Sequence, residues 1–392
     1  MDFDLSWILL GLPLAFALGW LASRMDLRQL RAENRQAPKA YFKGLNFLLN
    51  EQQDKAIDAF IEAMQNDPDT TELHFALGNL FRRRGEYSRA VRVHEHLLSR
   101  ADLSRADHER AQHGLAQDFL KAGLLDRAEE ALRRLENTAF EAEARLALLA
   151  IYERSRDWPQ AAEIARNMQA ANQGDFSTRL AHYLCEQATE RSHHAQLEQA
   201  LSLLQEAQRT AAHAPRPRLE LARIQHRLGD SSAAWQTLLE LAHAAPSGLT
   251  LAIPLLLDVA VAAQRQPQTI ALLRERYQQA PSLDILQALV QLHADPDGAG
   301  GDLCANVDDC RVWYVRHLDK ELSLVAATRW LTDELAPDTQ YRPAILKALE
   351  HATKPLLRYR CAACGFETRQ HFWHCPGCQS WDSYPARRVE EL

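Results

Sequence analysis

The sequence begins with an apolar stretch of 18 residues without a charge, from Leu5 to Ala22. As a helix, this stretch would be about 27 Å long, close to the hydrocarbon thickness of a bilayer. Aspartates precede it, and several arginines, the first of which is Arg24, follow it. Because flanking positive charge marks the cytoplasmic side, the pattern predicts a transmembrane anchor over residues 1–23, a basic juxtamembrane segment over residues 24–36, and a cytoplasmic location for the rest of the chain. A cleaved signal peptide, the alternative, would carry its positive charge before the apolar stretch.

A second pattern repeats along the middle of the chain. Gly44 and Ala56 recur 34 residues later as Gly78 and Ala90, and a phenylalanine recurs in the same register. Small residues are expected where the two helices of a hairpin cross closely. This order and spacing resembles the tetratricopeptide repeat, which is a pair of antiparallel helices. A plain helical bundle with accidental alanine spacing is the alternative.

The small residue of the second helix recurs further along the chain, at Ala128, Ala161, Ala200 and Ala234. The sequence therefore predicts six recognisable repeats. Beyond Ala245 the helical periodicity continues without the signature, which indicates two or three degenerate units. We expect an all-α solenoid with a concave face that suits a helix or an extended peptide of another protein.

The predicted repeat array spans residues 37–294. A loop rich in glycine and aspartate follows over residues 295–309, and a helical extension over residues 310–355. The roles of Cys304, within this loop, and of Cys310, directly after it, stay open.

Composition supports a helical, intracellular protein. Apolar residues make up 46% of the chain and charged residues 25%, as in globular proteins. The net charge of −7 and the isoelectric point of about 6.2 provide no basic field, so we expect no nucleic-acid partner. Seven cysteines without regular spacing over the main body indicate a reducing compartment rather than a disulfide scaffold.

Two CxxC pairs close the sequence within a segment predicted to form a metal module over residues 356–386. They are Cys361 with Cys364, and Cys375 with Cys378. Each pair can direct two thiolates at one ion, so the two pairs together predict a tetrahedral four-sulfur site. Four thiolates leave no open position for a metal-bound water, which argues against hydrolysis at this site.

The identity of the metal ion stays open between iron and zinc. The two knuckles resemble those of rubredoxins, which hold iron, but the connecting stretch is shorter and Gln379 stands where rubredoxins usually have glycine. Zinc ribbons use the same four ligands. Glycines at 365 and 377 are expected to permit the tight backbone of each knuckle. The resemblance leaves an alternative function open, a rubredoxin-like electron-transfer protein with a repeat-based docking surface.

The order of these parts, ending in CxxCGF…WHCPxC, resembles the lipopolysaccharide assembly protein B family of Gram-negative bacteria. The resemblance implies a non-catalytic, single-pass protein of the inner membrane whose bulk faces the cytoplasm. It implies a scaffold that presents the deacetylase of the committed step to lipid A to a membrane-bound AAA+ protease. Other lipopolysaccharide assembly or signalling membrane proteins would be further partners, and homodimer formation stays open.

Overall fold

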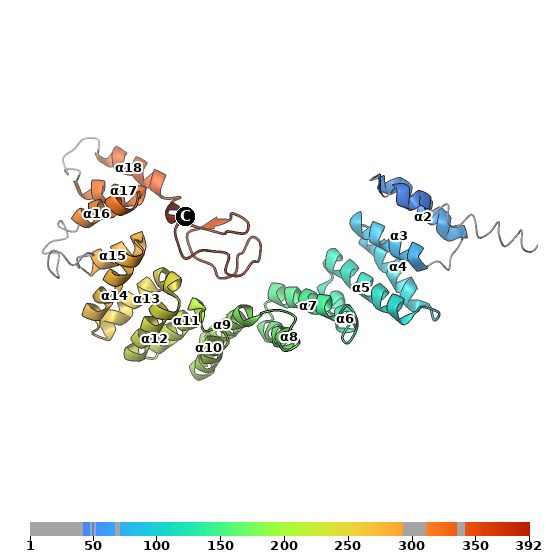
Figure 1. Cartoon of the computed structure of the whole chain (residues 1–392), viewed down its shortest axis with the longest axis horizontal. Helices are drawn as coiled ribbons and strands as arrows, with labels where there is room; N and C mark the ends of the chain where they lie inside the picture. Colours follow the sequence, from blue (N-terminus) through green and yellow to red (C-terminus); the bar gives the residue numbers. More distant parts are fainter. Residues whose placement is uncertain (1–41, 48, 51, 67–70, 293–310, 335–341) are drawn as a thin grey trace, which may run out of the picture. The chain divides into compact units, whose positions relative to one another are not determined.

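A computed structural model describes residues 42–47, 49–50, 52–66, 71–292, 311–334 and 342–392 (Figure 1). The predicted transmembrane anchor, the juxtamembrane segment and the glycine- and aspartate-rich loop lie outside these residues. Among the described residues, no helix combines the length and apolar character needed to cross a membrane. The chain divides into two compact units, Met1–Ser155 and Arg156–Leu392.

The first unit is a succession of helices in which each packs against the next. They are α2 (Gln53–Asn66), α3 (Thr71–Arg83), α4 (Tyr87–Ser99), α5 (Arg105–Ala122), α6 (Leu125–Arg133) and α7 (Glu141–Ser155). The turns between them are short, and Gly123, which ends α5, has φ of +76° and adopts the left-handed conformation of a helix C-cap. A core of Ala56, Phe60, Leu77 and neighbouring apolar side chains fills the space between α2 and α3.

Close packing explains the glycines of the repeat. A β-carbon at Gly44 would lie 2.5 Å from Cε1 of Phe60, and one at Gly78 would lie 2.6 Å from Cε1 of His94. Gly114 makes the same room on α5, because its β-carbon would lie 2.7 Å from Nε2 of His94. The His94 ring therefore occupies a slot between two glycines of successive repeats.

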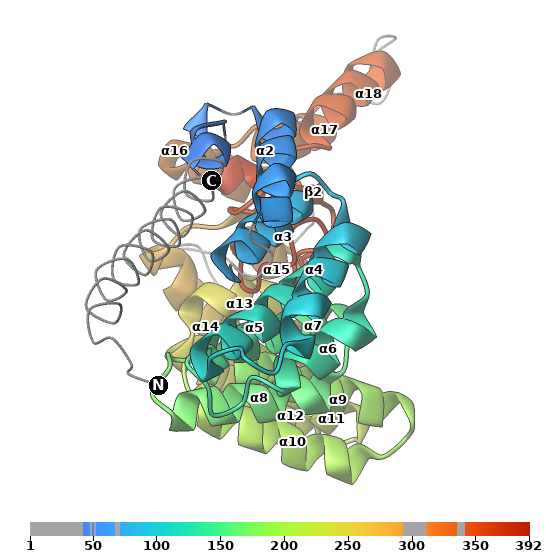
Figure 2. The same cartoon turned by 90° about the vertical axis from the view of Figure 1, so that its right-hand side faces the viewer.

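The second unit continues the helical pairs and ends in the cysteine-containing module (Figures 1 and 2). Its helices in the array are α8 (Trp158–Ala170), α9 (Ser177–His193), α10 (Leu197–Thr210), α11 (Pro215–Arg227), α12 (Ser231–Ala244), α13 (Leu249–Ala262), α14 (Gln266–Gln279) and α15 (Leu283–Gln291). The extension contributes α16 (Arg311–Lys320), α17 (Leu324–Glu334) and α18 (Arg342–Thr353). Figure 2 shows α9 to α12 stacked side by side, as their contacts require.

The repeat positions predicted from the sequence are among the most buried small residues of these helices. The six alanines are Ala56, Ala90, Ala128, Ala161, Ala200 and Ala234, and each is 0% exposed. In the next unit the equivalent residue is Thr269, which is also 0% exposed and whose hydroxyl accepts a hydrogen bond from Nε1 of Trp235 at 3.1 Å. The structure confirms the all-α, tetratricopeptide-type fold class with a small terminal metal-binding module.

Candidate metal centre

The first knuckle, which contains Cys361 and Cys364, is the turn between the two strands of a small antiparallel sheet. Strands β1 (Tyr359–Arg360) and β2 (Glu367–Thr368) pair, and the chain between them turns through Cys361 and Cys364. The N–H of Cys361 donates to the carbonyl of Phe366 at 3.0 Å, and the N–H of Gly365 donates to the carbonyl of Cys361 at 2.9 Å. Gly365 has φ of +76°, a conformation that glycine adopts without a steric penalty.

The second knuckle repeats this geometry fourteen residues later, with one change of residue type. The N–H of Cys375 donates to Ser380 at 2.9 Å, and that of Gln379 donates to Cys375 at 2.8 Å. Gln379 is therefore the counterpart of Gly365, and its φ of +59° puts a bulky residue in the left-handed region. The expectation for Gly377 was wrong, because its φ is not positive and an added β-carbon would meet Sγ of Cys364 at an ordinary 3.5 Å.

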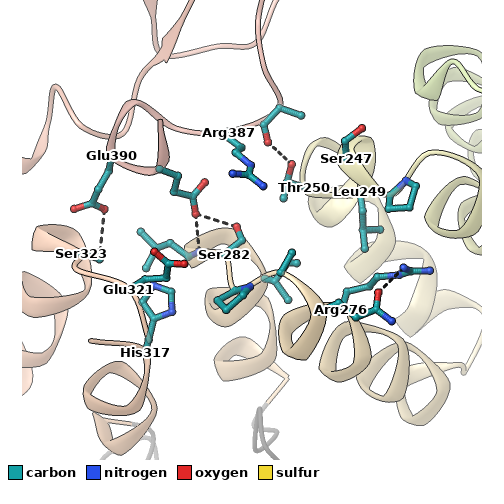
Figure 3. Close-up of a pocket in the computed structure, with 18 of the residues that line it drawn as sticks. Ser247, Leu249, Thr250, Arg276, Ser282, His317, Glu321, Ser323, Arg387 and Glu390 are labelled. Carbon is teal, nitrogen blue, oxygen red and sulfur yellow. Dashed lines mark hydrogen bonds between the residues drawn. The ribbon is translucent and has the colours of Figure 1, made fainter. Parts of the chain in front are cut away.

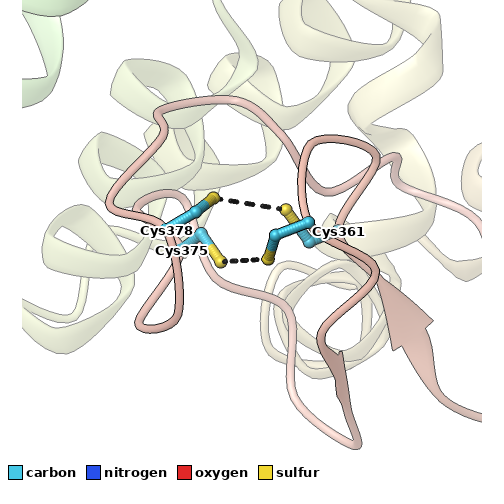
Figure 4. A group of neighbouring side chains, drawn as sticks. Cys361, Cys375 and Cys378 are labelled. Carbon is cyan, nitrogen blue, oxygen red and sulfur yellow. Dashed lines mark hydrogen bonds between the residues drawn. The ribbon is translucent and has the colours of Figure 1, made fainter. Parts of the chain in front are cut away.

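The two knuckles bring four sulfur atoms together (Figure 4). Sγ of Cys361 lies 3.8 Å from Sγ of Cys378, Sγ of Cys364 lies 3.8 Å from Sγ of Cys375, and all four lie within 4.8 Å of one another. A tetrahedral ion with metal–sulfur bonds of about 2.3 Å has sulfur–sulfur edges of about 3.8 Å. The spacing is also far longer than the roughly 2.05 Å of a disulfide. The cluster thus has the dimensions of a single four-thiolate site.

Hydrogen bonds around two of the sulfurs, those of Cys361 and Cys378, favour the thiolate form. Burial alone would raise the pKa of Cys361, but its hydrogen bond with the Ser383 hydroxyl, at 3.3 Å, and the backbone N–H groups of the turn outweigh burial and lower the pKa to about 6. The hydroxyl of Ser380, 3.3 Å away, and the N–H of the same residue lower the pKa of Cys378. Such donors spread the negative charge that four thiolates concentrate on one ion.

The thiolate form of Cys364 is opposed by the other sulfurs of the cluster. The N–H of Phe366 favours its thiolate, but burial and the three neighbouring sulfurs oppose it and raise its pKa to about 12. Four negative charges at this spacing repel one another unless a cation neutralises them. The donor set therefore fits a divalent or trivalent ion that prefers sulfur, and both iron and zinc meet this description.

The metal module is docked on helices of its own unit through Trp381 and Asp382. Trp381 stacks on His182 of α9 with ring centroids 4.8 Å apart and meets the edges of Trp158 and Tyr183 at 6.0 and 5.8 Å. Nε2 of His182 donates to the Asp382 carboxylate at 2.8 Å. Burial lowers the pKa of His182, which favours the neutral ring for this contact.

Other candidate side chains have different roles. His371 lies 3.1 Å through Nε2 from the carbonyl of Tyr384, and His374 stacks on Trp381 at 4.4 Å, so neither belongs to the cluster. The buried thiol of Cys185 has a pKa raised to about 12 by burial, which makes it a poor nucleophile.

Arg82 on α3 is held by polar groups of its own repeat and of the next one. The Arg82 guanidinium donates to Asp118 at 2.8 Å, to the carbonyl of Gly114 at 3.1 Å, and to the side chain of Asn79. The remaining Asp118 oxygen bonds Nδ1 of the buried His94 at 2.5 Å. These groups connect successive repeats and form their hydrogen bonds with one another.

Comparison with known proteins agrees with this geometry. Residues 359–384 match the family described as rubredoxin metal binding domain. The chain is similar to lipopolysaccharide assembly protein B of Escherichia coli strain K12, with 28% identity over 410 residues that cover 99% of this chain and 100% of the relative. Lipopolysaccharide assembly protein B of Haemophilus influenzae is 27% identical, and the match covers 96% of each protein. These full-length matches confirm the family resemblance seen in the sequence.

Among solved structures, a tetratricopeptide repeat protein from Parabacteroides merdae has a TM-score of 0.33 and 13% identity, covering 66% of this chain and 98% of that protein. The Naa15/Naa10 complex bound to HypK-THB contains a chain with a TM-score of 0.45 and 14% identity, covering 82% of this chain and 48% of that one. The repeat assignment for this chain rests on its own buried alanines and glycine contacts.

Proposed function

We propose that this chain, which is similar along its full length to lipopolysaccharide assembly protein B, acts in lipopolysaccharide assembly as a non-catalytic scaffold. The observation that carries the proposal is the closed four-sulfur centre docked on the helical array. Four thiolates would saturate a tetrahedral ion, so the ion would hold the module together rather than bind a substrate. Cys361, Cys364, Cys375 and Cys378 would be its ligands.

The contribution of the ion is structural. The module has only two short strands and a four-residue buried core, Tyr359, Cys361, Cys375 and Tyr384, which is too little to fold alone. Structural zinc in small peptides supplies about 10–16 kcal/mol of binding free energy, which becomes folding free energy. The folded module then holds Trp381 and Asp382 against α9. These contacts would keep the module in one position on the helical array, so that both present a constant surface to other proteins.

We further propose a membrane anchor over residues 1–23 at the inner membrane, with the array on the cytoplasmic side. In this arrangement the array presents the lipid A pathway deacetylase to a membrane-bound AAA+ protease. A scaffold raises the effective concentration of one protein near another without new chemistry, which fits a repeat array held beside the bilayer.

The experiment is to deplete the chain in its own cells and measure the half-life of the deacetylase after translation is stopped. The proposal predicts a longer half-life on depletion, recovery with the wild-type chain, and no recovery with Cys375→Ser. Cys185→Ala, which removes a buried thiol outside the cluster, is the matched control and should restore degradation. An unchanged half-life on depletion would refute the proposal.

Electron transfer remains the second candidate, because Cys364 and Cys378 are exposed and could pass an electron from an iron centre. The two functions differ in their metal requirement. Protein loaded only with zinc has no accessible redox couple, so full function of the zinc form in cells would exclude electron transfer.

A further inference from the structure

A cavity of about 310 Å³ lies away from the sulfur cluster, at the end of the helical array (Figure 3). It is bounded by the start of α13, the end of α14, the start of α15, the turn between α16 and α17, and the C-terminal tail. This volume is at the lower end of the range of about 300–1,000 Å³ typical of ligand pockets. Three parts of the second unit meet here, and none of the four cysteines lines it.

Part of the wall of this cavity is apolar and preformed. Leu249, Leu283 and Ile285 line it and are otherwise buried in the core, so their positions do not depend on a ligand. Leu322 lines the same cavity and is 97% exposed. A ligand with an apolar side chain would remove part of that surface from water, which is favourable at about 25 cal/mol per Å².

Two of the acidic groups at the cavity are already satisfied. Glu391 accepts hydrogen bonds from the N–H of Leu283 at 2.8 Å and from the Ser282 hydroxyl at 3.0 Å. Glu390 accepts from the N–H of Val325 and the Ser323 hydroxyl, both at 2.9 Å. Both carboxylates cap the N-terminus of a helix, where the partial positive charge balances them.

The cations at the cavity, by contrast, keep unused donors. Within the described part of the chain, the Arg387 side chain makes no hydrogen bond or ion pair. Arg387 lines the cavity, and Figure 3 shows its guanidinium pointing into it. Across the cavity, Nε of Arg276 is buried without a hydrogen-bond partner among the described residues. Glu321 is the lining carboxylate without such a bond, so the unused donors outnumber the unused acceptors.

We propose that this cavity binds a short segment of another protein in which a leucine-like side chain lies next to a carboxylate. The apolar side chain would rest on Leu283 and Ile285, and the carboxylate would accept from Arg387. The apolar lining is interrupted by the hydroxyl groups of Ser247 and Thr250. A peptide, which has a polar backbone beside its apolar side chain, suits such a lining better than a fatty acyl chain, which is apolar throughout. This proposal is independent of the proposed function, because peptide binding to the cavity is measured on the purified protein.

The test is calorimetric titration of the full chain in lipid nanodiscs with the peptide Gly-Ser-Leu-Leu-Glu bearing a free C-terminus. We expect saturable binding that weakens about tenfold in Arg387→Gln, equivalent to about 1.4 kcal/mol. Arg369→Gln is the matched control, because Arg369 is an exposed arginine of the metal module outside this cavity. The uncharged peptide Gly-Ser-Leu-Leu-Gln-amide should bind at least tenfold more weakly than the acidic one.

Several results would overturn the proposal. These are no heat of binding at millimolar peptide, equal affinity in wild type and Arg387→Gln, or tighter binding of dodecanoate or inorganic phosphate than of the acidic peptide. Arg387→Gln removes no hydrogen bond or ion pair of the described part of the chain, so its thermal midpoint should equal that of the wild type. A lowered midpoint would mean that Arg387 is structural and would also count against the proposal.

Discussion

The last residues of the chain cap two helices, and removing one negative charge should loosen one helix and spare the other. Glu391 bonds the first N–H of α15 at 2.8 Å, whereas Glu390 bonds the N–H of Val325 in the first turn of α17 at 2.9 Å. Glu391→Gln and Glu390→Gln keep the shape and one acceptor oxygen but lose the charge. A charge at a helix N-terminus contributes about 0.3–1 kcal/mol when exposed and up to about 2 kcal/mol when partly buried.

The expected effect can be placed within that range from burial. Ser282 and Ser323, which bond the same carboxylates, are 9% and 7% exposed, so solvent screens these contacts only in part. We therefore expect about 1 kcal/mol for each substitution, which corresponds to about fivefold faster amide exchange in the first turn of the affected helix. Full truncation of the side chain in Glu391→Ala should cost about 2 kcal/mol, because the cap is lost as well.

The assay is hydrogen–deuterium exchange of the full chain, followed by peptide mapping of α15 and α17. Glu391→Gln should speed exchange in α15 and leave α17 unchanged, and Glu390→Gln should do the reverse. Glu163→Gln, an exposed glutamate on α8, is the control. Unchanged exchange in α15 of Glu391→Gln, or equal changes in both helices from either substitution, would refute the capping account.

Three further predictions concern single positions. Gly78→Ala places a β-carbon 2.6 Å from the ring of His94 and should lower stability by about 1–3 kcal/mol in urea unfolding, whereas an unchanged midpoint would mean that the slot is wider than described. Gln379→Gly should relieve about 1–2 kcal/mol of strain, because glycine adopts the left-handed conformation freely, whereas the greater freedom of glycine in the unfolded chain should cost about 0.4–1 kcal/mol. The folded module should therefore be more stable and should lose its ion to a chelator more slowly. Faster loss of the ion would contradict this. Burial lowers the pKa of His317, so the folded state binds fewer protons than the unfolded state, and stability should fall as the pH drops below about 6.5. His317→Gln should flatten that slope between pH 7 and pH 5, and an equal slope in both proteins would exclude this histidine as its source.

The repeat positions were predictable because close helix crossing admits only small residues. Each of the six alanines found by spacing is fully buried, as is Thr269, which spacing alone could not identify. Threonine fits the same position because its hydroxyl accepts from Trp235, a partner 34 residues away in the sequence. A search restricted to glycine and alanine therefore loses the repeat where a polar contact replaces a methyl group.

The four metal-ligand candidates were predictable from local spacing, but the contacts around them were not. The four residues of a CxxC motif are enough to predict the local turn, whereas the hydrogen bond from His182 to Asp382 joins residues 200 positions apart in the sequence. Glu391 likewise reaches Leu283 across 108 residues. No periodic pattern marks such contacts, because each depends on how the C-terminal residues dock on the helical array.

The most direct test of this account is X-ray absorption of the full chain, purified without added metal and combined with elemental analysis. The account predicts one iron or zinc ion per chain, surrounded by four sulfur atoms at about 2.3 Å and no nitrogen. A shell containing a histidine nitrogen, or fewer than four sulfurs, would show that the two knuckles do not close on one ion. Both the metal centre and the scaffold built on it would then have to be abandoned.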